Sequence, residues 1–298
     1  MNPTDVDAQF VAEAWAAWRI LGGGALLFGM LVGSFLNVCI SRMPEDRSVA
    51  YPPSHCPSCG SSIRPYDNIP VFSWLVLLRG KCRDCRQPIS SLYPSIELLM
   101  GLLSLLLFWR FVPDPGAVDG PHGAAFAVHF VFFAMLVVVT FIDIRHYIIP
   151  DELSIYAAPL GIAASAGLAW IGAPDAVGLR GALVGSVAGA GVLVSVMLFY
   201  RLVRGQDGMG WGDPKLLAMI GAFLGALPAL PFVVFVACLA GSVVGLSLMA
   251  LNRRAGWGMR SAVPFGPFLA LGAMVWVLHG PQMISRWFPG VHYLLAVG

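Results

Sequence analysis

Long apolar runs separated by short polar segments dominate the sequence. A run of about 20 apolar residues can cross the hydrocarbon core of a membrane as a helix, because a helix satisfies its own backbone hydrogen bonds. We count eight such runs, at roughly 20–40, 94–112, 124–142, 153–172, 181–200, 214–229, 232–251 and 263–282. The pattern predicts an all-α polytopic membrane protein with about eight transmembrane helices. The sixth and seventh runs share a very short turn at Pro228, so a single re-entrant pair is an alternative.

The distribution of basic residues predicts the orientation of these helices, because Lys and Arg are retained on the cytoplasmic side. If the segment after the first helix is inside, 14 of the 18 basic residues fall inside. The other four fall outside: Arg19, Arg110, Arg180 and Arg286. This partition places both termini outside and the loop 42–93 in the cytoplasm. We therefore expect a multi-pass protein of the bacterial inner membrane.

Composition supports a chain that is mostly in contact with lipid or with other helices. Hydrophobic residues make up 58% of it and charged residues 11%, whereas soluble domains are about 25% charged. The net charge of +2 is too small to indicate a nucleic-acid partner. The spacing Gly181, Gly185, Gly189 predicts close approach of one helix to another, as is usual in membranes.

Four cysteines in the loop 42–93 form two C-x2-C pairs: Cys56 and Cys59, then Cys82 and Cys85. Two such pairs about 20 residues apart can place four thiolates around one tetrahedral Zn²⁺, each pair forming a turn whose amides point at sulfur. With all four positions filled by protein ligands, the zinc would be structural. Two disulfides or a dithiol redox couple are alternatives, although structural disulfides are rare in the cytoplasm.

The spans and the cysteine loop together predict three parts. Residues 1–41 are the N-terminal segment and the first transmembrane helix, residues 42–93 are a small cytoplasmic loop domain that binds a metal through its four cysteines, and residues 94–298 are the transmembrane core.

Two aspartates lie where predicted spans meet the cytoplasm, Asp143 at the end of one helix and Asp213 at the start of another. Acidic groups at the edge of a bilayer core are costly unless they are paired or functional. Two carboxylates held together share one proton, as aspartic proteases require. Gly210 and Gly212 would let a substrate strand or a partner helix approach the second aspartate.

Structural roles for these aspartates are the competing interpretation. Asp143 is followed by Arg145, and Asp213 by Lys215, so each has a possible local partner. Asp213 would also suit a helix N-cap. We expect Asp151 to be structural, and we leave open whether Glu97 pairs with a basic residue or lines a site.

Several segments together resemble one family, the bacterial type IV prepilin peptidases, over most of the chain. The matching segments are 33–38 (GSFLNV), the two cysteine pairs, 73–75 (SWL), 78–82 (LRGKC), 93–94 with Glu97, Asp143 with 149–150, and 208–215 (GMGWGDPK). Each segment alone is weakly specific, but their order and spacing together are highly specific.

The resemblance implies a bifunctional leader peptidase and N-methyltransferase of the G-x-G-D aspartic protease group, serving type IV pili or type II secretion. It makes Asp143 and Asp213 the catalytic pair, with Gly210, Gly212 and Lys215 on the substrate-approach loop. Residues 94–298 then become the peptidase core. The implied substrates are prepilins or pseudopilins with a short basic leader, and the implied methyl donor is S-adenosylmethionine, whose binding residues the sequence does not identify.

Two other functions remain alternatives at this stage. A membrane thiol oxidoreductase would use the two cysteine pairs for redox chemistry. A transporter or assembly scaffold without enzymatic activity would use the aspartates to bind ions or protons.

Overall fold

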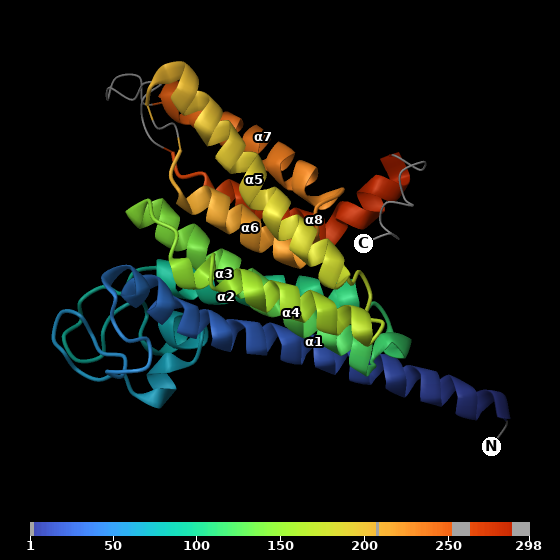
Figure 1. Cartoon of the computed structure of the whole chain (residues 1–298). Coiled ribbons are helices and arrows are strands. Elements are labelled where there is room, and N and C mark those ends of the chain that lie inside the picture. Colours follow the sequence, from blue (N-terminus) through green and yellow to red (C-terminus); the bar gives the residue numbers. More distant parts are fainter. Residues whose placement is uncertain (1–2, 207–208, 252–262, 288–298) are drawn as a thin grey trace. The chain divides into compact units, whose positions relative to one another are not determined.

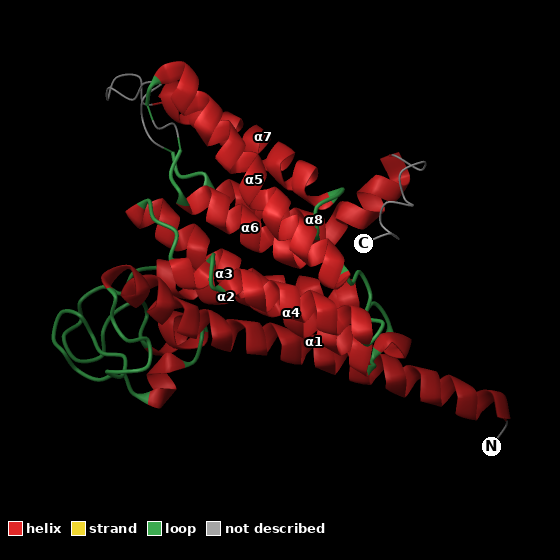
Figure 2. Ribbon diagram, viewed as in Figure 1, coloured by secondary structure: helices red, strands yellow, loops and turns green. Residues whose placement is uncertain are grey.

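The computed structural model describes residues 3–206, 209–251 and 263–287. Gly208 and the predicted inside residues Arg253, Arg254 and Arg260 lie outside these ranges. The described chain contains eight α-helices: α1 (Pro3–Arg42), α2 (Leu92–Phe111), α3 (Gly120–His146), α4 (Ala157–Trp170), α5 (Gly178–Arg204), α6 (Gly212–Leu224), α7 (Ala229–Leu251) and α8 (Gly266–Trp287). The described residues form no strand, and a long loop joins α1 to α2 (Figures 1 and 2).

The all-α membrane architecture is confirmed, and each predicted span overlaps one helix. Six segments of the described chain are long and apolar enough to cross a membrane, and they contain α1 to α5 and α7. The helix α6 is shorter than its predicted span because it ends at Gly225, whose φ of 77° belongs to the region that favours glycine. Thus α6 and α7 are separate helices.

The chain divides into two compact units, Met1–Val138 and Val139–Gly298, with the boundary inside α3. The division predicted from the sequence, at residues 41 and 93, stays a prediction.

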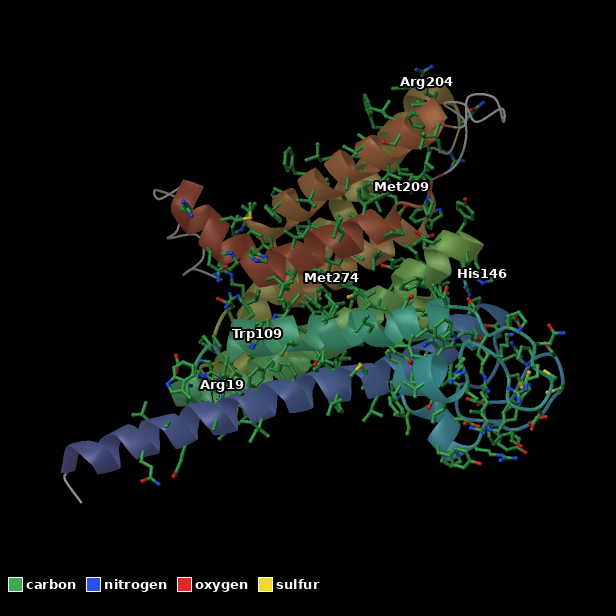
Figure 3. The ribbon with its side chains drawn as sticks, turned by 180° about the vertical axis from the view of Figure 1, so that it is seen from behind. Arg19, Trp109, His146, Arg204, Met209 and Met274 are labelled. Carbon is green, nitrogen blue, oxygen red and sulfur yellow. The ribbon has the colours of Figure 1, made fainter. Side chains whose placement is uncertain are left out.

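In the first unit, α1 and α2 pack antiparallel. The indole N–H of Trp18 donates to the carbonyl of Val112 at 2.8 Å, and Figure 3 shows Arg19 on α1 and Trp109 on α2 at the same end of the pair. The backbones touch at Gly29, where an added Cβ would lie 2.6 Å from the carbonyl oxygen of Met100. Glycine therefore permits a contact that any larger residue would prevent.

In the second unit, α5 and α6 meet backbone to backbone. A Cβ at Gly185 would collide with the carbonyl of Gly221, and one at Gly189 with the carbonyl of Leu217. The close approach predicted for Gly185 and Gly189 is confirmed. The hydroxyl of Ser165 on α4 donates to the carbonyl of Ala222 at 2.9 Å, which ties a third helix to α6.

Candidate metal centre and carboxylate site

Two short turns carry the cysteine pairs in the first unit, and the turns have the same construction. In the first, the amide of Cys56 donates to Ser61 and the amide of Gly60 donates back to Cys56, both at 2.9 Å. In the second, the amide of Cys82 donates to Gln87 at 2.8 Å and the amide of Arg86 to Cys82 at 3.1 Å. Each turn therefore holds both of its thiols on one side through local main-chain bonds.

These turns direct hydrogen-bond donors at sulfur, as the C-x2-C spacing predicts. The pKa of Cys82 is lowered, first by backbone hydrogen bonds from Cys85 and Asp84. The pKa of Cys59 is lowered to about 6, first by the side chain of Ser61. Donors aimed at sulfur favour the thiolate, which is the form that binds metal.

The four cysteines form one cluster, with sulfur atoms that all lie within 4.8 Å of one another. The sulfurs of Cys56 and Cys85, from different turns, are 3.8 Å apart. Zn–S bonds of about 2.3 Å in a tetrahedron place sulfurs about 3.8 Å apart, so the cluster fits a zinc ion. The described cysteines form no disulfide, and a mixed cluster differs from the two separate pairs that a dithiol redox couple requires.

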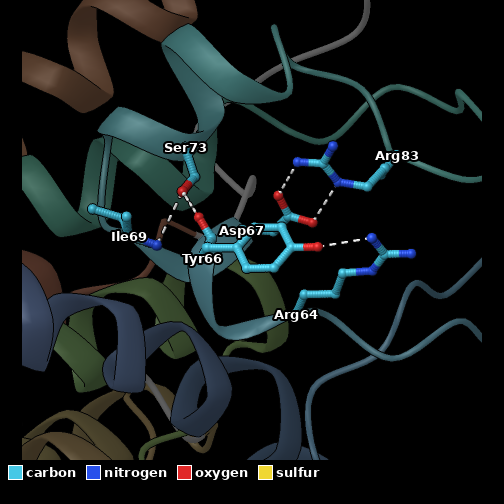
Figure 4. A network of polar contacts seen from close by, with 6 residues as sticks. All are labelled: Arg64, Tyr66, Asp67, Ile69, Ser73 and Arg83. Carbon is cyan, nitrogen blue, oxygen red and sulfur yellow. Dashed lines mark hydrogen bonds and ion pairs between the residues drawn. The ribbon is translucent and has the colours of Figure 1, made fainter.

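A polar network connects the second cysteine turn to the short helix η2 (Pro65–Asn68). Arg83, inside the turn, binds the carboxylate of Asp67 with both Nε, at 2.8 Å, and Nη2 (Figure 4). The pKa of Asp67 is lowered, first by this hydrogen bond. The guanidinium of Arg83 also lies over the ring of Tyr66, 5.4 Å from its centroid. Such bidentate pairing fixes geometry as well as charge.

Glu97, whose role the sequence left open, lies at the start of α2 in the first unit and is 8% exposed. Its carboxylate accepts the amide N–H of Val71 at 2.7 Å and interacts with the hydroxyl of Ser34. It thereby connects α1, α2 and the cysteine loop.

The second unit contains both predicted catalytic aspartates. Asp143, in the last turn of α3, is 5% exposed. Its Oδ2 accepts a hydrogen bond of 3.0 Å from the amide of Gly266, the first residue of α8. The bond orients this carboxylate at the N-terminus of a helix, where negative charge is stabilised.

Asp213 is partly buried in the first turn of α6, a helix too short to be a candidate span. Its pKa is raised to about 7, first by burial and then by the charge of Asp143. The two carboxylates are therefore close enough to influence each other's protonation, as two like charges at one site do.

Ile149 fills the space between the segments that carry these groups. Its side chain lies 3.0 Å from where a Cβ of Gly212 would be and 3.3 Å from where a Cβ of Gly266 would be. Both glycines are therefore required for the close packing of α6 and α8 around Ile149. This gives Gly212 a packing role.

The basic neighbour of Asp213 binds another group. Lys215 donates to the carboxylate of Asp151 at 2.7 Å, and both side chains are about a third to a half exposed. Asp151 thus acts as the partner of Lys215 at the start of η5 (Asp151–Leu153). Gly210 is exposed just before α6. The roles of Gly210 and Lys215 toward substrate stay predictions.

Gly266 is the residue that sequence reasoning missed. It carries no reactive side chain, and its contribution is a backbone N–H 123 positions away from Asp143. An added Cβ would lie 2.6 Å from Oδ2 of Asp143. The only local signal is the placement of a glycine between Phe265 and Pro267 at the beginning of an apolar run.

A helical membrane protein with two interacting buried carboxylates has the form of a membrane aspartic peptidase. Residues 27–111 match the bacterial peptidase A24 N-terminal domain, and residues 130–246 match the type IV leader peptidase family. The chain belongs to the type IV leader peptidase family.

Its relatives are similar along nearly their whole length. The "Prepilin leader peptidase/N-methyltransferase" of Aeromonas hydrophila is 37% identical, over 88% of this chain and 91% of the relative. The proteins of the same name from Stutzerimonas stutzeri and Burkholderia pseudomallei (strain 1026b) are each 36% identical, over 88% and 86% of this chain and 92% and 84% of the relative. No solved structure matches the chain. None of these names indicates a redox enzyme or a transporter.

Proposed function

We propose that this protein removes the leader peptide of prepilins or pseudopilins and methylates the new N-terminal amine, with Asp143 and Asp213 as the catalytic pair. The observation that carries the assignment is the effect of Asp143 on the protonation of Asp213 within one unit. The family and the named relatives support the two activities.

The two carboxylates divide the work of peptide hydrolysis. Asp213, with a pKa of about 7, holds the shared proton at neutral pH and delivers it to the substrate carbonyl or the leaving amine. Asp143, oriented by Gly266, takes a proton from the attacking water. The pair titrates as a unit, and catalysis requires its singly protonated form.

The location of the reaction follows from the distribution of basic residues. The cysteine loop and the aspartate site belong to the cytoplasmic side of the inner membrane, and the protein is surrounded by lipid. A prepilin whose apolar helix stays in the membrane presents its leader there.

The cysteine cluster holds a structural Zn²⁺ through Cys56, Cys59, Cys82 and Cys85. A loop with a small core gains folding free energy from such a metal. The zinc stabilises the loop and takes no part in peptide cleavage.

Methylation requires the new amine in its neutral form, close to the donor. S-adenosylmethionine supplies the methyl group: the amine lone pair forms the N–C bond as the C–S bond breaks, S-adenosylhomocysteine leaves, and the amine releases one proton. The residues of the chain have to orient the two reactants and exclude water.

Cleavage of a synthetic prepilin by the purified protein tests the catalytic pair. Asp143→Asn and Asp213→Asn should each lower the cleavage rate by about 10²–10⁴-fold, because each removes a proton-transfer group. Asp151→Asn is the matched control: it makes the same change in the same unit, at an exposed ion pair worth little. Near-normal cleavage by either catalytic variant would refute the assignment.

A further inference from the structure

The first unit contains a cavity of about 550 Å³. Three parts of this unit form its wall: the end of α1 from Ser34 to Arg42, the cysteine loop, and the start of α2 from Tyr93 to Glu97. Small-molecule sites have volumes of about 300–1,000 Å³. A second cavity, near the end of α8, is lined by only four residues. The first cavity therefore has the size and enclosure of a ligand site.

The wall of this cavity carries both signs of charge and an aromatic ring. Its acidic side chains are Asp67, Asp84 and Glu97, and its basic ones are Arg42, Arg47, Arg64 and Arg83. Trp74 also lines it, half-buried, with its indole N–H donating to the carbonyl of Ile89 at 3.2 Å. A mixed wall of this kind suits a ligand that is itself cationic, anionic and aromatic in different parts.

Hydrogen bonds hold the wall in place before any ligand arrives. Asp67 is bound by Arg83, Ser73 donates to the carbonyl of Tyr66 at 2.9 Å (Figure 4), and Glu97 accepts the amide of Val71. The φ of Val71 is 60°, an unusual value for a β-branched residue, and the bond to Glu97 contributes to holding it. Preorganised walls lower the entropic cost of binding.

We propose that this cavity binds S-adenosylmethionine, the methyl donor of the proposed methyltransferase activity, on which the inference rests. The donor combines a purine with a carboxylate, an ammonium and a sulfonium. Trp74 offers a ring face for the purine, Asp84 and Glu97 offset the positive groups, and Arg64 is the cation for the carboxylate. The described chain has no strand, so a donor site there is built from helices and loops, as this one is.

The cavity also explains how a structural metal supports methylation. Cys56 and Cys82 belong to its wall, so the zinc fixes one side of the donor site. Both catalytic aspartates belong to the second unit. Metal loss therefore weakens donor binding while the peptidase pair is unaffected.

The test is binding of tritiated S-adenosylmethionine to the full-length protein in lipid nanodiscs, measured by equilibrium dialysis. Val38→Trp places an indole in the cavity from the side of α1. Phe35→Trp is the matched control, on the same helix, exposed and outside the wall. We expect Val38→Trp to weaken binding at least tenfold and Phe35→Trp to leave it unchanged. Ultraviolet cross-links of the donor, mapped by mass spectrometry, should fall within residues 34–97.

Wild-type affinity in a folded Val38→Trp protein, or cross-links confined to residues 139–287, would overturn the proposal. Thermal unfolding and zinc content show whether the variant is folded. If it is not, Trp74→Leu gives the same test: it should weaken binding at least tenfold, and unchanged affinity again overturns the site. A wild-type protein that methylates prepilin but binds the donor elsewhere sinks this site alone. One that neither binds nor methylates sinks the methyltransferase function.

Discussion

The two units of this protein build their sites by different means. In the first, main-chain bonds between residues at most five positions apart arrange each pair of cysteines, and the two turns then meet. In the second, Asp143 and Gly266 are 123 positions apart and meet only because helices pack around Ile149. The first site is assembled from local turns that a metal joins, whereas the second depends on helix packing. Changes to one should therefore leave the other largely intact.

Metal removal tests this separation with the largest expected effect. A strong chelator should release one zinc per chain, expose four further thiols to a thiol reagent and abolish methylation, because the turns lose their common ligand. Leader cleavage should fall by no more than a few-fold. Thiol titration and both activity assays measure this, and equal, complete loss of both activities would contradict the comparison.

Gly266→Ala makes the opposite perturbation, in the second unit. The new Cβ would lie 2.6 Å from Oδ2 of Asp143 and displace it, and a misplacement of about 1 Å costs about 10²-fold in rate. Cleavage should fall by about that factor, with donor binding unchanged. Gly245→Ala is the control, because a Cβ there meets nothing within 4 Å. If both variants cleave at the same rate, Gly266 does not position Asp143.

The pH dependence of cleavage sharpens the assignment of roles. Because the pKa of Asp213 is raised to about 7, its proton is present below that pH and lost above it. The cleavage rate should be highest near neutrality and fall by about tenfold per unit at higher pH. A rate profile from pH 5 to 9 measures this. A constant rate up to pH 9 would remove the proton from Asp213.

Asp67→Asn should have the smallest effect of the four. The amide keeps the shape of the carboxylate but loses the charge that Arg83 binds. Outer contacts of metal sites influence affinity by about tenfold or more, and this contact is one step further from the metal. We expect zinc affinity to fall several-fold, as measured by competition with a chromophoric chelator, and cleavage to be unchanged. A loss of cleavage would show that the network serves the peptidase.

Local signals allowed much of this structure to be predicted from the sequence. Runs of apolar residues indicated every helix, and the C-x2-C spacing of Cys56 and Cys82 with their partners indicated a cluster. The glycines at 185 and 189 indicated a close helix contact because their spacing is that of one helix face.

Long-range backbone contacts account for most of what could not be predicted. The N–H of Gly266 has no side-chain chemistry to mark it, and the pair of Lys215 with Asp151 spans 64 positions. The end of α6 at Gly225 depends on a backbone conformation that an apolar run conceals. Asp143 and Asp213 were distinguished from structural aspartates by family resemblance more than by local pattern.

The short length of α6 has a consequence for how the protein responds to its membrane. Its 13 residues extend about 20 Å, less than the roughly 30 Å of a hydrocarbon core. The glycine contacts with α5 fix α6 to a helix of 27 residues. The depth of Asp213 is therefore set by a protein neighbour, and the carboxylate should stay at the same height relative to α5 when bilayer thickness varies. Hydrophobic mismatch would then tilt α5 and α6 together.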